Sequence, residues 1–155
     1  PLDFFIGAVR ATETHVNPDW LLQTMLEDLS QYPYGWNPPN GYPDDAGAWI
    51  SSAGLLARWN TAMALTHTAW SEPDTGMVTR LDQLVGTPST AAELVGAVAG
   101  RVFGTSALPD DAQAAFVDYV SGGEGPDAPV TPGRLGGKLG TLFGLMLASP
   151  LYQWR

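Results

Sequence analysis

YPYGWNPPNGYPDDAGAWISSAGLLARWNTAMAL, residues Tyr32 to Leu65, is the stretch of sequence that decides the fold. The first part, residues 31–47, is rich in proline, glycine and aromatic residues. Because proline lacks a backbone N–H and fixes its φ angle, this part predicts a long loop rather than a helix or a central strand. The part that follows predicts a long amphipathic helix from Ala48 to Trp70, capped by Asp44 or Asp45.

Apolar side chains in this helix recur at intervals of seven residues. Trp49, Leu56, Met63 and Trp70 form one line along its surface. A repeat of this kind is typical of the stripe that a helix buries against its neighbours. The line therefore supports the prediction of an amphipathic helix.

The rest of the chain also predicts helices. Thr90 and Glu93 fit a capping box, and a last helix opens at Thr131 and ends before Pro150. No segment shows the apolar and polar alternation of a strand. The sequence therefore predicts an all-α fold of about seven helices, in one compact orthogonal or bundle-like domain over residues 1–155.

Three glycines, Gly136, Gly140 and Gly144, lie on one face of the last helix. Glycine inside a helix costs about 1 kcal/mol relative to alanine, so repeated glycine on one face suggests a specific packing role. Arg134 and Lys138 interrupt the line, which argues against the dimerisation motif of membrane helices. We predict a groove that lets a neighbouring helix approach closely.

The composition predicts a packed, acidic protein. Sixteen acidic residues against seven basic ones give a net charge of −9, and 45% of the residues are hydrophobic. This charge repels phosphate backbones, and no basic cluster offsets it, so we expect no nucleic-acid partner. The absence of cysteine excludes disulfides and thiolate chemistry. The longest apolar run, Leu139 to Ala148, is too short to span a membrane.

The aromatic side chains of the loop are candidate binding residues. Trp36, Tyr42 and Trp49 could stack on sugar rings, because flat apolar faces with polar edges suit a pyranose. The alternative, which we favour, is that the rings anchor a loop without regular backbone pairing over the core.

The loop also carries oxygen ligands close together in sequence. Asn40, Asp44 and Asp45 are of the type that Ca²⁺ uses, but their spacing matches no calcium-loop signature. Capping of the following helix explains the two aspartates, and we predict no metal and no cofactor.

Three polar residues of the predicted helix complete the candidate site. Asn60 and His67 are seven residues apart, so their side chains could share a polar pocket. Arg58 follows an apolar run, and we expect it to meet an internal carboxylate or loop carbonyls. The second histidine, His15, stands near Glu13, but no metalloprotease or similar spacing links the two histidines. No catalytic residue can be named.

A family resemblance rests on the opening stretch. Within Asn37 to Leu65, PPNGYPDDAGAWISSAGLLARWNTAMAL resembles the carboxy-terminal signature of the bacterial domain-of-unknown-function 1800 family, which combines a PPN segment, a Trp-Ile pair and a Leu-Leu-x-Arg-x-Asn helix. The segment from Pro1 to Ala11 and the closing LASPLYQWR are also similar to family segments. Leu151 and Tyr152 stand where the family usually has Glu-Phe, so one acidic residue is missing.

The resemblance implies that the chain is the carboxy-terminal third of a longer, exported bacterial protein, periplasmic or extracellular, and it implies no activity. We expect a structural or interaction region that packs on the amino-terminal region of the same protein through the loop and the helix. The alternative is an enzyme or a carbohydrate-binding cleft walled by residues 32–49, with a polysaccharide or another protein as partner.

Overall fold

A computed structural model describes residues 2–17, 19–32, 34–43, 45–49, 51–67 and 77–153. Its helices and strands follow one another along the chain as α1 (Leu2–Thr12), β1 (His15–Val16), α2 (Asp19–Asp28), the 3₁₀ helix η1 (Ala46–Trp49), α3 (Ser52–Thr66), β2 (Met77–Val78), the 3₁₀ helix η3 (Leu81–Gln83), α4 (Ala91–Phe103), α5 (Asp110–Ser121), α6 (Pro132–Ala148) and α7 (Pro150–Gln153). The fold is predominantly α-helical with compact packing, as the sequence predicts.

The prediction of no strand is wrong at one place. β1 and β2 pair antiparallel, with His15 opposite Val78 and Val16 opposite Met77. Each strand is two residues long, so neither contains enough residues to show the alternation that marks a strand in sequence.

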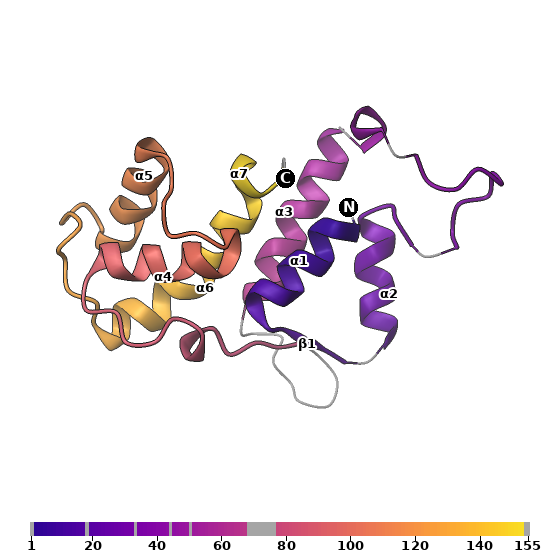
Figure 1. Ribbon diagram of the computed structural model, residues 1–155. Coiled ribbons are helices and arrows are strands. Elements are labelled where there is room, and N and C mark those ends of the chain that lie inside the picture. Colours follow the sequence, from indigo (N-terminus) through magenta and orange to yellow (C-terminus); the bar gives the residue numbers. More distant parts are fainter. Residues whose placement is uncertain are drawn as a thin grey trace.

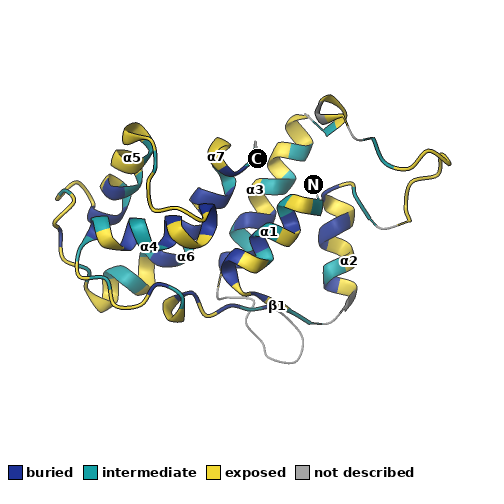
Figure 2. Ribbon diagram, in the orientation of Figure 1, coloured by how far each residue is buried: buried dark blue, intermediate teal, exposed yellow. Residues whose placement is uncertain are grey.

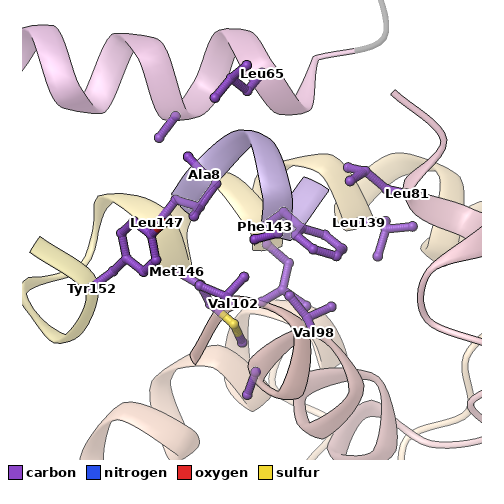
Figure 3. Packing of buried hydrophobic residues seen from close by; sticks show 14 of the residues in the cluster. Ala8, Leu65, Leu81, Val98, Val102, Leu139, Phe143, Met146, Leu147 and Tyr152 are labelled. Atoms are coloured by element: carbon purple, nitrogen blue, oxygen red, sulfur yellow. The ribbon is translucent and has the colours of Figure 1, made fainter. Parts of the chain in front are cut away.

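Helix α6 is the centre of the fold. It packs against α3, α4, α5, α7 and η3, and Figure 1 shows it joining α1–α3 to α4 and α5. Its buried side chains recur at spacings of three and four residues, which places them on one broad face. They are Leu139, Leu142, Phe143, Met146 and Leu147. Figure 3 shows Phe143 between Ala8 of α1 and Val98 of α4.

The glycine groove of α6 is confirmed at two of the three predicted positions. A Cβ atom at Gly140 would lie 2.5 Å from the carbonyl oxygen of Thr66, and one at Gly144 would lie 2.5 Å from Sδ of Met63. At Gly136 a Cβ would meet nothing within 4 Å. Thr66 and Met63 belong to α3, so α3 is the helix that approaches α6 closely.

Helix α3 is shorter than the predicted span from Ala48 to Trp70. Its N-cap is Ser51, whose Oγ accepts a hydrogen bond of 3.0 Å from the backbone N–H of Gly54, and its C-cap is His67. The caps expected at Asp44 or Asp45 are therefore wrong for this helix, because a separate 3₁₀ turn, η1, comes between. Trp70 lies outside the described residues.

Buried threonine hydroxyls fix the carboxyl end of α3 to the strand pair. Thr14 and Thr79 join their hydroxyls at 2.8 Å, and Thr79 also donates to the carbonyl of Leu65 at 2.9 Å. The hydroxyl of Thr12 joins this network through a hydrogen bond of 2.6 Å with the hydroxyl of Thr14. The carbonyls of the last helical turn have no partner within the helix, so the hydroxyl of Thr79 satisfies one of them.

Candidate interaction surface

The loop before α3 folds upon itself through a cluster of three rings. The ring centroids of Trp36 and Tyr42 are 5.2 Å apart, and those of Tyr42 and Trp49 are 5.8 Å apart. The Tyr42 hydroxyl donates to the carbonyl of Tyr32 at 2.6 Å, and Nε1 of Trp49 donates to the carbonyl of Pro43 at 2.8 Å. The cluster therefore holds the loop in shape through the loop's own carbonyls. We call residues 31–49 the aromatic arm.

The aromatic arm extends away from the helices. Figure 1 shows its backbone leaving α2 and sweeping outward before it returns to α3, and Figure 2 shows it mostly exposed. Trp36 is 39% exposed and Tyr34 is completely exposed. The expectation that the rings anchor the loop over the core is therefore wrong for Trp36, because it packs on Tyr42, a ring of the same loop.

The predicted oxygen cluster of the arm does not form a metal centre in the part that is described. Asn40 and Asp45 are both exposed, and Asp44 lies outside the described residues. The carbonyl of Asp45 accepts a hydrogen bond of 3.1 Å from the N–H of Ala48, so Asp45 immediately precedes η1 and bonds to its first turn. Among the described residues, no group of three or more His, Asp and Glu side chains is placed to hold a metal ion.

The first half of α3 exposes large apolar side chains. Leu55 is 36% exposed, Leu56 is 55% exposed and Trp59 is 44% exposed. The predicted apolar line of this helix is therefore divided, because Leu56 is exposed whereas Met63 meets Gly144 of α6. In the second half, Met63 and Thr66 meet the glycines of α6, and Ala62 and Leu65 are completely buried.

Arg58 lies on this half of α3 and joins it to α7. The side chain is half-buried, and its Nε donates to the Oε1 atom of Gln153. Burial lowers the pKa of Arg58, since desolvation disfavours the charged form. The expectation that Arg58 meets an internal carboxylate or loop carbonyls is wrong. The guanidinium forms an ion pair with no described residue, and its hydrogen-bond acceptor is the neutral side-chain amide of Gln153.

Asn60 and His67 do not share a buried pocket. Both side chains are exposed, at different turns of α3. The backbone N–H of His67 donates to the carbonyl of Ala64 at 3.3 Å, so this residue ends the helix. The two therefore do not combine with the rings of the arm into a convergent polar site.

A partly open pocket lies elsewhere, beside the strand pair. Its volume is about 180 Å³, and Glu13, His15 and Arg80 are among its lining residues. Glu13 also forms an ion pair with Arg101 of α4. Glu13, His15 and Arg80 are all exposed, so this pocket lacks the buried polar groups that a catalytic centre uses.

The structure brings together residues that the sequence does not connect. Arg58 reaches α7 through Gln153, and Nε1 of Trp59 donates to the carbonyl of Ala148 at 2.9 Å, where α6 ends. Leu151 of α7 is 37% exposed. We call Leu55, Leu56, Arg58, Trp59 and Leu151 the α3–α7 face. No helix in the described part of the chain is long and apolar enough to cross a membrane.

Comparison with known families matches residues 1–154 to the family described as "Protein of unknown function (DUF1800)". This match confirms the resemblance read from the proline-rich stretch and the two ends of the chain. Searches of curated proteins and of solved structures gave no match.

Proposed function

This chain belongs to the DUF1800 family of proteins of unknown function, and we propose that it is an interaction region without catalytic residues of its own. The aromatic arm and the α3–α7 face pack against the amino-terminal region of the same longer protein. We propose also that the chain is a carboxy-terminal part of that protein and that residues 1–155 form one folded unit within it.

The observation that supports this proposal is the exposed apolar surface of the first half of α3. Single exposed apolar residues are common on protein surfaces, but a cluster of them marks an interaction site. Leu55, Leu56 and Trp59 lie within two turns of one helix, directly after the arm with its exposed Trp36. Tryptophan is among the residue types that carry most binding energy at interfaces.

The form of the arm favours protein contact over carbohydrate stacking. The planes of Trp36 and Tyr42 are inclined at 40°, and those of Tyr42 and Trp49 at 42°. Rings inclined in this way pack on one another and do not present one flat platform to a sugar. The candidate polar groups Asn60 and His67 also lie away from the ring cluster, on α3.

Site-specific photo-cross-linking of the natural full-length protein tests the proposal. A benzophenone amino acid placed at Leu56 is expected to cross-link to a segment of the same polypeptide outside residues 1–155, identified by peptide mapping. The matched control places the same amino acid at Ala115, which is exposed on α5 at the other end of the fold. No such cross-link is expected there.

Two results would contradict the proposal. One is that position 56 cross-links only within residues 1–155 or to a second copy, which isotopically mixed samples distinguish. The other is that the full-length protein binds a polysaccharide on a glycan array and that Trp36→Ala abolishes the binding. That result would support the carbohydrate-binding alternative instead.

A further inference from the structure

We propose that Asn40 is a site of spontaneous covalent modification, at which the side-chain amide becomes a carboxylate through a cyclic imide. The imide forms between Cγ of Asn40 and the backbone nitrogen of Gly41. This inference concerns the outward end of the aromatic arm and goes beyond the proposed function, on which it does not rest. It requires that the turn over residues 38–41 stays accessible to water in the folded protein.

The reaction is an intramolecular attack followed by hydrolysis. The backbone nitrogen of Gly41 loses its proton to water and bonds to Cγ of Asn40. The bond from Cγ to Nδ2 then breaks, and Nδ2 leaves as ammonia after taking a proton from water. A second water molecule opens the imide ring at either of its carbonyl carbons. Water is the only co-reactant.

The first reason is the residue that follows Asn40. Glycine has no side chain to hinder the approach of its nitrogen, and its backbone is permissive. A Cβ atom at Gly41 would meet nothing within 4 Å, so the space beside this residue is open. Asn17 and Asn37 each precede a proline, whose nitrogen carries no hydrogen and cannot form the imide. In the sequence, Asn40 is the one asparagine that a glycine follows.

The second reason is the exposure of the turn. Asn40 and Gly41 are both exposed, and Figure 1 shows residues 34–43 at the outward end of the arm. The N–H of Gly41 donates to the carbonyl of Pro38 at 3.4 Å, which is longer than the usual range of about 2.7–3.2 Å. This hydrogen bond therefore holds the attacking nitrogen weakly, at a loop tip where the backbone is least restrained.

Asn60 provides the matched comparison within the same chain. It is exposed, as Asn40 is, but it lies inside α3, so the N–H of Thr61 belongs to the hydrogen-bond ladder of a helix. The helix must open locally before this nitrogen can reach Cγ, and the branched side chain of Thr61 hinders the approach. The two asparagines therefore differ in backbone freedom and in the following residue, although both are exposed.

The products distinguish this route from simple hydrolysis of the amide. Opening of the ring at one carbonyl gives aspartate, and opening at the other gives isoaspartate, in which the main chain runs through the side chain. Direct hydrolysis gives aspartate alone. Isoaspartate also lengthens the backbone between Trp36 and Tyr42, whose ring centroids are 5.2 Å apart. The modification therefore alters the segment that joins two rings of the arm.

Mass spectrometry of the natural full-length protein tests the inference. The folded protein is incubated at neutral pH in water labelled with heavy oxygen, digested with pepsin in acid, and mapped by fragmentation between Asn37 and Asn40. Asn40 is expected to take up the label as a mixture of isoaspartate and aspartate, at a rate at least about tenfold higher than that of Asn60. Asn37 is expected to keep its amide.

Unfolding in urea and one variant separate the contribution of the fold from that of the sequence. Because the turn is exposed, the rate at Asn40 in the folded protein is expected to lie within about tenfold of its rate in urea. The rate at Asn60 is expected to rise in urea, since α3 no longer restrains it. Gly41→Ala is expected to slow the conversion of Asn40 at least about threefold, because the methyl group restricts the backbone and hinders the nitrogen.

Three results would overturn the inference. One is an amide at Asn40 that persists in the folded protein and converts only in urea, since the turn would then be covered or rigidly held. Another is labelled aspartate without isoaspartate, and the third is a rate at Asn40 no higher than that at Asn60. None of these results changes the cross-link expected from position 56, so failure of this inference and failure of the proposed function are distinguished.

Discussion

The two halves of α3 differ in their surroundings more than in their composition. Both contain leucines, but Leu65 in the second half is completely buried, whereas Leu56 in the first half is 55% exposed. Helices α3 and α6 lie antiparallel. Thr66 near the end of α3 meets Gly140, and Trp59 nearer its start meets Ala148 at the end of α6. Helix α6 ends there, so the first half of α3 continues beyond its main neighbour.

This difference shows that the partner helix determines which part of α3 is core. The hydrophobic repeat continues along α3. Such a repeat indicates that a helix has an apolar face, but it does not indicate which part of that face another helix will cover. Helix α6 covers the half that lies against its glycines. The other half is left with α7, the aromatic arm and, in our proposal, a segment of the same longer protein.

Truncation of one leucine in each half gives the largest expected contrast. Leu65→Ala is expected to lower the free energy of unfolding by about 2–5 kcal/mol, since it removes buried atoms and leaves a cavity. Leu56→Ala is expected to change it by less than about 0.5 kcal/mol, because the side chain is exposed. Urea denaturation of both variants measures this contrast. Equal losses would mean that the two halves are packed alike.

Glycine substitutions test the close contact that separates the halves. Gly140→Ala is expected to destabilise by about 1–3 kcal/mol, because its Cβ would meet the backbone carbonyl of Thr66, which cannot move aside easily. Gly136→Ala is the matched control on the same helix. It is expected to stabilise by up to about 1 kcal/mol, since it meets nothing and improves helix propensity.

Thermal unfolding of these two glycine variants measures both effects. The contradiction to look for is a stabilised Gly140→Ala variant. That outcome would mean that α3 does not approach α6 closely at Thr66.

The hydroxyl network at the buried end of α3 gives the smallest contrast. Thr79→Val is expected to destabilise by about 1–2 kcal/mol, because the carbonyl of Leu65 and the hydroxyl of Thr14 lose a partner inside the protein. Thr24→Val removes an exposed hydroxyl that bonds to Trp20 within α2, and less than about 0.5 kcal/mol is expected.

Guanidinium chloride unfolding monitored by circular dichroism compares the two threonine variants. If Thr79→Val is as stable as the wild type, the network does not fix the second half of α3. The comparison of the two halves would then rest on the contact with α6 alone.

The helix ends were the most predictable part of the candidate region and of the fold. The capping box at Thr90 and Glu93 and the N-cap at Thr131 are present as predicted, because a cap depends on residues within one turn. The start of α3 was missed: Ser51 caps it, although aspartates stand earlier in the loop. Local sequence alone offered several caps, and the 3₁₀ turn η1 decided between them.

The contacts of the site residues were much less predictable. The sequence placed aromatic residues in the arm, but not their packing on one another, which depends on how the loop returns to Trp49. It named Arg58 as a residue needing a partner, but Gln153 lies far away in the chain. Such a pair leaves no periodic signal in a single sequence.

The sequence by itself determined the all-α class, the long loop, the caps at Thr90 and Thr131 and the family. These features depend on residue type and on spacing within a few turns. The tertiary structure alone decided which face of α3 is buried, where the arm points and which residues Arg58 and Trp59 meet. Those properties follow from the closeness of α3 and α6, and that closeness requires glycines on one helix to meet particular atoms of another.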